Sequence, residues 1–223
     1  MKGRLIAIDG LDGSGKATQS KRLSETLAAD GYSLRRISFP NYESKSSTLV
    51  KMYLNGELGE HADSTGPFAA SSFFALDRYI SYVTDWKRDY DEGKLVLADR
   101  YTSANAVHQL SKIPRGEWDA FLEWLCDFEY KKLGIPAPDA VIYLEMLPEY
   151  SLELINRRAE QTGRTKDIHE LDPDYLCRSY EAAVYAADRL GWERVQCYDP
   201  DGILGIDEIA REVRLRVKHR LGI

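Results

Sequence analysis

A glycine-rich stretch near the N-terminus has the residue types and spacing of a phosphate-binding loop. Residues 8–19 read IDGLDGSGKATQ, in which Gly10, Gly15 and Lys16 fit the pattern G-x-x-x-x-G-K-[ST]. Glycines adopt positive φ without steric cost, so successive backbone N–H groups of such a loop can point inward and bind phosphate. The lysine then contacts the β and γ phosphates of a nucleotide as a point charge. The residues predicted to bind ATP are Gly10, Leu11, Asp12, Gly13, Ser14, Gly15, Lys16, Ala17 and Thr18.

Ala17 departs from this pattern, because the last position normally supplies a hydroxyl ligand to Mg²⁺. A water molecule can take that ligand position, since Mg²⁺ commonly keeps several waters. Losing one such partner costs about 1.5–3 kcal/mol, or one to two decades in rate, which falls far short of abolishing the reaction. Asp99, an acid at the end of a predicted strand, is the residue that we expect to bind the hydrated ion through its water ligands. The sequence therefore predicts Mg²⁺ as cofactor.

Arginines further along the chain could neutralise the charge of a phosphoryl group in transfer. Arg78 and Arg100 can each present a guanidinium fork to two phosphate oxygens. A second basic group within residues 156–170 consists of Arg157, Arg158, Arg164 and Lys166. We expect this segment to be a lid that closes over the triphosphate, because the glycine loop has no basic residue before its lysine. A solvated charged face is the alternative.

Short apolar runs alternate with longer stretches of helical period along the chain. The runs that are typical of buried strands cover residues 4–8, 32–39, 94–98 and 140–144, with 194–197 as a fifth candidate. The stretches of helical period include 68–90, 118–132 and 206–221. This alternation predicts a parallel sheet with helices on both faces, and ligands bind such sheets beyond the carboxyl ends of the strands. Asp9, Phe39, Asp99 and Glu145 fall at those ends, so we expect the candidate residues to collect on one rim.

Composition and net charge indicate a folded globular protein and disfavour several other classes. Of 223 residues, 43% are hydrophobic and 30% charged, as in a folded globular domain, and the formal net charge of −6 disfavours a nucleic-acid coat protein. The first apolar run is about four residues long, too short for a signal-peptide core, and no later run approaches a membrane span. Three cysteines without a C-x-x-C pair disfavour a zinc site. We expect one domain, 1–223, in the cytoplasm, with neither a nucleic-acid nor a membrane partner.

Several motifs, in the right order around the glycine loop, resemble the thymidylate kinase family. They are Phe39-Pro40, Phe74-Ala-Leu-Asp-Arg78, Asp99-Arg100-Tyr101, Leu133-Gly-Ile-Pro136 and Pro138-Asp139. The resemblance extends from the first strand to about Tyr185. It implies an α/β fold like that of the P-loop nucleoside monophosphate kinases, with a parallel five-stranded sheet, helices on both faces and a small lid. It also implies Mg²⁺-dependent transfer of the γ-phosphoryl group of ATP to dTMP, giving dTDP and ADP, by a homodimer.

The same resemblance implies roles for individual residues. Phe74 would stack on thymine, Asn105 would bind the base edge, and both Arg78 and Arg100 would hold the acceptor phosphate. Asp12 would contact the 3′-hydroxyl of the sugar and help Asp99 to order the metal. The residues predicted to bind dTMP are Asp12, Phe39, Pro40, Tyr42, Phe74, Arg78, Arg100, Asn105, His108 and Glu170. Those predicted to act in catalysis are Lys16, Asp12, Arg100, Arg157 and Arg164.

Three further positions differ from the family pattern. Asn41 stands where an arginine is common, and Ala104 stands where a serine is common. His108 replaces a tyrosine that is expected to disfavour a 2′-hydroxyl, so we expect looser selection against ribonucleotides. The remaining histidines, His61, His169 and His219, are expected to be solvated.

Two alternative functions stay open at this point. The first is a kinase for another pyrimidine monophosphate, such as dUMP or a cytidylate. The second is a catalytically retired nucleotide-binding protein, for which Ala17 is the only support. A nucleoside kinase is disfavoured, because its neutral hydroxyl acceptor needs a carboxylate base, and Phe39-Pro40 at the end of the second strand brings none.

Overall fold

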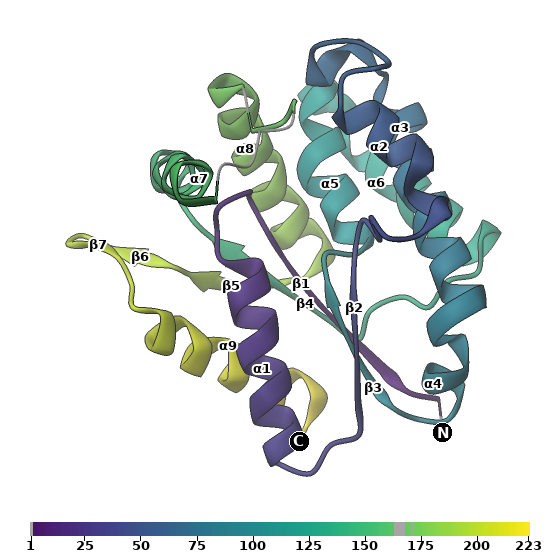
Figure 1. Ribbon diagram of the computed structural model, residues 1–223, viewed down its shortest axis with the longest axis vertical. Helices are drawn as coiled ribbons and strands as arrows, with labels where there is room; N and C mark the ends of the chain where they lie inside the picture. The colour runs from purple at the N-terminus through teal and green to yellow at the C-terminus, as the bar shows by residue number, and fades with distance from the viewer. Residues whose placement is uncertain (1, 163–167, 171) are drawn as a thin grey trace.

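The predicted strands form one parallel sheet. In the computed structural model, which describes residues 2–162, 168–170 and 172–223, the strand order is β2-β3-β1-β4-β5 (Figure 1). The strands are β1 (Arg4–Gly10), β2 (Leu34–Ser38), β3 (Leu95–Asp99), β4 (Ala140–Glu145) and β5 (Glu193–Gln196). Each neighbouring pair is parallel, so the predicted fold class is confirmed, including the fifth strand.

The central strands are apolar on both faces because helices cover both sides of the sheet. Ile6 and Ile8 of β1 belong to one apolar cluster, and their neighbours Leu5 and Ala7 belong to another. All six residues of β4 are buried. This double burial explains why these strands read as continuous apolar runs in the sequence.

Helices follow the strands in alternation (Figure 1). They are α1 (Lys16–Ala29), α2 (Thr48–Leu54), α3 (Pro67–Ser81), α4 (Lys87–Asp91), α5 (Thr102–Gln109), α6 (Trp118–Cys126), α7 (Pro148–Thr162), α8 (Pro173–Leu190) and α9 (Ile206–Leu221). α1 and α9 pack on the face that contains Ile6 and Ile8, and the segment between α3 and α4 packs on the opposite face. α5, α6 and α8 form a further cluster with one another.

Two of the predicted helices are interrupted by π-helical turns. The stretch 68–90 changes to a π-helix at Tyr82–Trp86, and 118–132 changes at Asp127–Lys132. A π-turn adds a residue to the helical repeat and rotates the following side chains. Trp86 and Glu129 both lie within these turns and are fully buried. Periodicity alone predicts continuous helices and misses this rotation.

A short hairpin was not predicted from the sequence. It pairs β6 (Tyr198–Asp199) with β7 (Gly202–Ile203) in antiparallel fashion. Within the residues that the structure describes, none of the helices has both the length and the apolar character needed to cross a lipid bilayer.

Candidate active site

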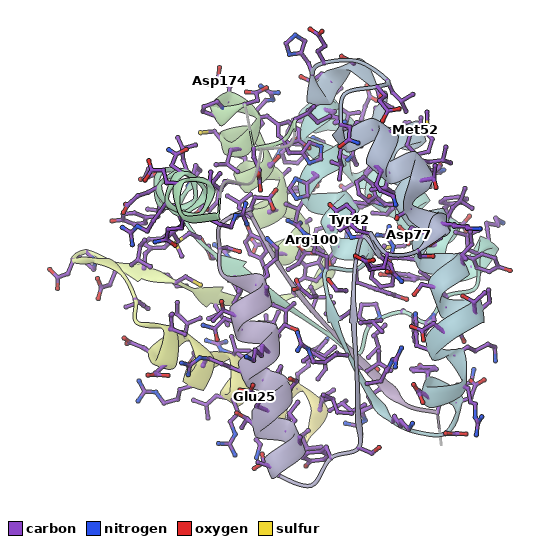
Figure 2. The ribbon with its side chains drawn as sticks, viewed as in Figure 1. Glu25, Tyr42, Met52, Asp77, Arg100 and Asp174 are labelled. Atoms are coloured by element: carbon purple, nitrogen blue, oxygen red, sulfur yellow. The ribbon has the colours of Figure 1, made fainter. Side chains whose placement is uncertain are left out.

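A cavity of ≈ 530 Å³ lies beside the carboxyl ends of β2 and β3 and the loop that follows β1, a typical size for a small-ligand site. Tyr42 and Arg100 mark its position in Figure 2. The residues predicted from the sequence that line it are Asp12, Gly13, Ser14, Gly15, Lys16, Ala17, Thr18, Phe39, Pro40, Tyr42, Phe74, Arg78, Asp99, Arg100, Asn105, His108 and Glu170. Leu11 differs, because its side chain is fully buried and packs with Val107 and Tyr143.

The glycine loop has the geometry that phosphate binding requires. Gly10, Gly13 and Gly15 have φ values of 157°, 82° and 84°, and Gly15 caps the start of α1. A Cβ at Gly13 would lie 2.5 Å from the backbone oxygen of Ser151, so a side chain there would clash. Lys16 Nζ donates hydrogen bonds to the backbone oxygens of Gly10 (3.0 Å) and Leu11 (2.6 Å), which holds the ammonium across the loop. Burial lowers the pKa of Lys16 to about 8, with Arg100 acting in the same direction.

Ser14 supports the same interpretation of the loop. Ser14 lines the cavity, and its buried hydroxyl has no hydrogen-bond partner among the residues that the structure describes. Buried hydroxyl groups are normally paired. A phosphate oxygen is a suitable partner for this donor.

Arg100 links the glycine loop to the rest of the cavity. It is the one non-glycine residue with positive φ (65°) in the described parts of the chain, which is an uncommon backbone conformation. Its guanidinium forms an ion pair with Asp12, contacts His108 Nε2 at 3.0 Å and lies 3.7 Å from Asp9. Although burial opposes it, Arg100 together with Lys16 holds the pKa of Asp12 well below its usual value. Both groups are therefore charged at neutral pH.

Two further carboxylates lie where β1 and β3 end. Asp9 is fully buried and accepts hydrogen bonds from Ser103 Oγ (2.7 Å) and from the Gly10 N–H (2.9 Å). Asp99 lies beside β1 in the sheet register and lines the cavity. Burial raises the pKa of Asp99, while Lys16 and Arg100 lower it. Asp99 therefore has carboxylate oxygens available to the cavity, whereas Asp9 supports the loop from behind.

Arg78 and Asn105 belong to a different network from Arg100. Arg78 donates to Glu129 through Nε (2.7 Å) and Nη2 (2.5 Å), and Asn105 Nδ2 donates to the same carboxylate at 3.0 Å. The carboxylate of Asp77, which directly precedes Arg78 in the sequence, accepts the backbone N–H of Asn41. Phe74, one helical turn before Arg78, lines the same cavity while packing edge-on against Tyr53. The two arginines therefore serve different parts of the cavity.

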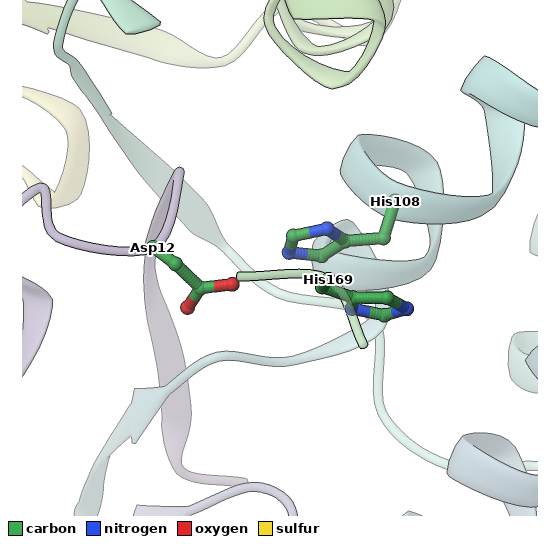
Figure 3. A group of neighbouring side chains, drawn as sticks. All are labelled: Asp12, His108 and His169. Atoms are coloured by element: carbon green, nitrogen blue, oxygen red, sulfur yellow. The ribbon is translucent and has the colours of Figure 1, made fainter. Parts of the chain in front are cut away.

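His169 was predicted to be solvated, and this prediction was wrong. It is 6% exposed, its Nε2 lies 2.7 Å from the hydroxyl of Tyr53, and its ring stacks on that of His108 at 5.1 Å. Figure 3 shows both rings facing the carboxylate of Asp12. Burial lowers the pKa of His169 to about 3 and also depresses that of His108, so both rings are neutral.

The cluster of Asp12, His108 and His169 has donor atoms within 4.8 Å of one another. Two observations argue against a metal centre there. The imidazole planes are only 15° from parallel, so their nitrogen lone pairs do not converge, and Arg100 already bonds to both Asp12 and His108. We interpret the histidine pair as a wall of the cavity.

The predicted lid segment is described only in part. Arg157 lies exposed on α7 and pairs with Glu153 at 2.6 Å, whereas its neighbour Arg158 lines the cavity and pairs with Glu170. Adjacent residues on a helix point about 100° apart, so only one of the two can face the site. The other two basic residues of the predicted lid, Arg164 and Lys166, lie outside the described residues.

Glu129 and His169 are the main residues of the site that sequence reasoning missed. Glu129 occupies a helical position three and four residues beyond Cys126 and Leu125, where an apolar residue is expected. A charged residue at such a position could have indicated a buried ion pair. For His169, the only available indication was its place directly before Glu170.

Comparisons with known proteins agree with this geometry. The family model described as thymidylate kinase matches residues 8–189. A thymidylate kinase from Mycobacterium tuberculosis is 33% identical over 186 residues, covering 82% of this chain and 84% of the relative. One from Glaesserella parasuis is 30% identical over 184 residues, covering 82% of each chain. One from Caenorhabditis elegans is 29% identical, covering 68% of this chain and 67% of the relative.

Proposed function

The chain belongs to the thymidylate kinase family, and we propose how its residues divide the reaction of that family among them. The reaction is transfer of the γ-phosphoryl group of ATP to dTMP, giving dTDP and ADP. The observation that carries the assignment is that one cavity is lined by the glycine loop with Lys16, by Arg100, and by Phe74 with Asn105. These are respectively suited to a triphosphate, a monophosphate and a flat base.

The donor nucleotide binds at the glycine loop. The loop amides and Lys16 hold the β and γ phosphates, and the hydroxyl of Ser14, which has no partner among the described residues, is a further candidate donor. Lys16 exchanges its bonds to the backbone oxygens of Gly10 and Leu11 for phosphate oxygens. Arg158, which lines the cavity from α7, supplies positive charge that the sequence interpretation gave to Arg157 and Arg164.

Mg²⁺ is the proposed cofactor, and the donor set on this rim fits it. Carboxylate oxygens are the ligands that Mg²⁺ prefers, and Asp99 gains from a nearby cation because burial disfavours its charged form. Asp99 and Asp12 would hold the ion, partly through water, and a water molecule would replace the hydroxyl that Ala17 lacks. Asp99 is the stronger candidate, since Asp12 is already paired with Arg100. When bound, the ion neutralises charge on the phosphoryl group in transfer.

The acceptor base binds between Phe74, Asn105 and Arg78. Asn105 Nδ2 donates one hydrogen to the backbone oxygen of Ser71 (3.1 Å) and the other to Glu129. Its Oδ1 can therefore accept a hydrogen bond from the base. Thymine offers a matching donor at N3–H. Arg78 uses one edge of its guanidinium on Glu129 and retains N–H groups for a carbonyl oxygen of the base. Its proposed role therefore moves from the phosphate to the base.

Arg100 holds the acceptor phosphate, beside Tyr42, Phe39 and Pro40. Asp12, His108 and Glu170 surround the sugar. A phosphate oxygen is already a nucleophile, so the protein contributes positioning and charge neutralisation rather than a strong base. Arg100 suits both tasks because Asp12 fixes its direction and its charge is permanent.

The oligomeric state and location are proposed on separate grounds. Leu76, Ile80 and Val83 follow one another at helical spacing and are 38%, 39% and 44% exposed, which supports a homodimer formed through this face. All three cysteines are free thiols, as expected in the reducing cytoplasm. We treat the whole chain as one kinase domain.

The experiment measures ADP release with ATP and dTMP, dUMP or dCMP, with and without Mg²⁺, for the wild type, Ala17→Ser and Lys16→Met. We expect Mg²⁺-dependent turnover with dTMP and at least a hundredfold loss in Lys16→Met, since a charge-assisted phosphate contact is lost. A faster Ala17→Ser enzyme means that the hydroxyl is missed, and an unchanged rate means that water replaces it. Wild-type turnover in Lys16→Met would contradict the donor assignment. ATP binding without any turnover would favour a retired enzyme.

A further inference from the structure

Glu129 is a fully buried carboxylate that lies behind the cavity wall. Its two oxygens accept four hydrogen bonds: two from Arg78 (2.7 and 2.5 Å), one from Asn105 (3.0 Å) and one from Thr102 Oγ1 (3.1 Å). Arg78 and Asn105 line the cavity, whereas Glu129 does not. Burying a carboxylate is unfavourable unless it is fully paired, and here each oxygen has two donors. Glu129 therefore acts on the cavity only through the residues that it holds.

The first consequence concerns the side-chain amide of Asn105. A carboxylate accepts hydrogen bonds and cannot donate, so the NH₂ group of Asn105 must face Glu129. The backbone oxygen of Ser71, which receives the second hydrogen, imposes the same orientation. If the amide were flipped, Oδ1 would face two other acceptors, the backbone oxygen of Ser71 and the carboxylate of Glu129, with no hydrogen between them. The carboxylate of Glu129 thus keeps Oδ1, an acceptor, turned toward the ligand.

The second consequence concerns Arg78. Two parallel N–H bonds to one carboxylate fix the plane of the guanidinium. The remaining N–H groups then present donors at a fixed place beside the Asn105 acceptor. This pair of one acceptor and one donor matches the N3–H and O4 of thymine or uracil. Cytosine presents the reverse, an acceptor at N3 and an amino group at C4.

We propose that Glu129 is a positioning residue that sets the preference for 4-keto pyrimidines over cytosine by fixing the hydrogen-bond polarity of Asn105 and Arg78. The proposal rests on the assignment of those two residues to the base edge in the proposed function. It extends that assignment to a residue which does not touch the substrate.

The test compares kcat/KM for dTMP and dCMP in the wild type and in Glu129→Gln. The glutamine has an NH₂ group in place of one acceptor oxygen. This group can donate to a flipped Asn105, and the side chain can no longer accept hydrogen bonds from both Arg78 and Asn105 through two oxygens. We expect the dTMP/dCMP ratio to fall at least about tenfold, mainly through KM for dTMP, because unpaired polar groups are what reject the wrong base. An unchanged ratio in a folded Glu129→Gln enzyme would overturn the proposal.

Glu145→Gln is the matched control. Glu145 is also a buried carboxylate, bonded by Arg194 and Tyr180, and it does not line the cavity. Its variant is expected to lose stability while keeping the base ratio. Glu129→Asp retains an acceptor-only group, so it is expected to keep the ratio within about threefold even where the rate falls. A ratio that collapses in Glu129→Asp would contradict the proposal, including in the case that Glu129→Gln does not fold.

Asn105→Ala separates this inference from the proposed function. An unchanged ratio in Asn105→Ala would mean that the base is read elsewhere, and the site assignment itself would be wrong. If the dTMP/dCMP ratio falls in Asn105→Ala but stays at the wild-type value in Glu129→Gln, the role of Glu129 would be wrong and the role of Asn105 would stand. In the double variant Asn105→Ala with Glu129→Gln, we expect the change in the dTMP/dCMP ratio to be much smaller than the two single changes combined, since both substitutions act through the amide of Asn105.

Discussion

Arg100 combines an uncommon backbone conformation with a central charge, and the two properties can be separated by mutation. Its φ of 65° disfavours residues with a Cβ by about 1 kcal/mol relative to glycine. Arg100→Gly and Arg100→Ala both remove the guanidinium, so we expect kcat/KM for dTMP to fall at least about a hundredfold in both. Urea unfolding should find Arg100→Gly more stable than Arg100→Ala by about 1 kcal/mol. Equal stabilities would mean that the backbone is not strained there.

The buried histidine pair makes stability depend on pH. The pKa of His169 is about 3 in the folded protein, below the ordinary value of 6.5 in the unfolded chain, so the unfolded state binds more protons between these values. The folded state therefore loses stability as the pH falls below 6.5, by about 2 kcal/mol from this ring between pH 7 and pH 5. His169→Phe should unfold with a shallower acid dependence.

The control for this prediction is His219→Phe. His219 is exposed near the end of α9 and should leave the pH dependence unchanged. The comparison uses the difference in unfolding free energy between pH 7 and pH 5, which removes the constant cost of losing the contact with Tyr53. An acid dependence that is identical in wild type and His169→Phe would contradict the buried, neutral state of this ring.

At the level of elements, the orientation of α7 places Arg158 at the cavity and Arg157, one residue earlier on the same helix, away from it. We expect Arg158→Ala to lower kcat at least about tenfold and Arg157→Ala to change it less than about threefold, because only a charge in the site stabilises the transition state. Steady-state ADP release measures both. A larger loss in Arg157→Ala would restore the assignment made from sequence alone.

The elements also explain what sequence reasoning could and could not find. The glycine loop and the acid at the end of β3 were predictable, because local spacing determines a phosphate loop and buried parallel strands read as apolar runs. The choice between Arg157 and Arg158 was not, since both belong to one charge run. The partnership of Arg78 with Glu129 depends on a contact across 51 positions and on the π-helical turn that buries Glu129. Periodicity carries no information on such contacts.

At the scale of the whole molecule, the cavity is assembled from distant parts of the chain. Asp12, His108 and His169 face one another across three separate segments, so local sequence offered only the position of His169 directly before Glu170 as an indication. Lys16, Arg100 and Arg158 lie in one cavity with Asp12, Asp99 and Glu170, and both arginines are ion-paired to acids of the same cavity. We therefore expect an anionic substrate to be held by contacts with individual cations, and the net charge of the chain, −6, gives no indication of where they lie.

The proposed homodimer links this architecture to the site through α3. Phe74 and Arg78 face the cavity, whereas Leu76 and Ile80, each two positions further and about 200° around the helix, lie exposed. A second copy that covers this face would hold the helix that carries the proposed base-binding residues, Phe74 and Arg78. We therefore expect dissociation of the dimer to raise KM for dTMP more than it lowers kcat.

Light scattering after size exclusion tests this with Leu76→Glu and Ile80→Glu together. The wild type should elute with twice the chain mass of 25.4 kDa, and the double variant with that mass alone, because two carboxylates cannot be buried unpaired in an apolar interface. Leu215→Glu, on the exposed side of α9, is the control and should stay dimeric. A wild type that is monomeric at micromolar concentration would contradict the dimer. A monomeric double variant with an unchanged KM would instead mean that α3 holds the base-binding residues without help from a second chain.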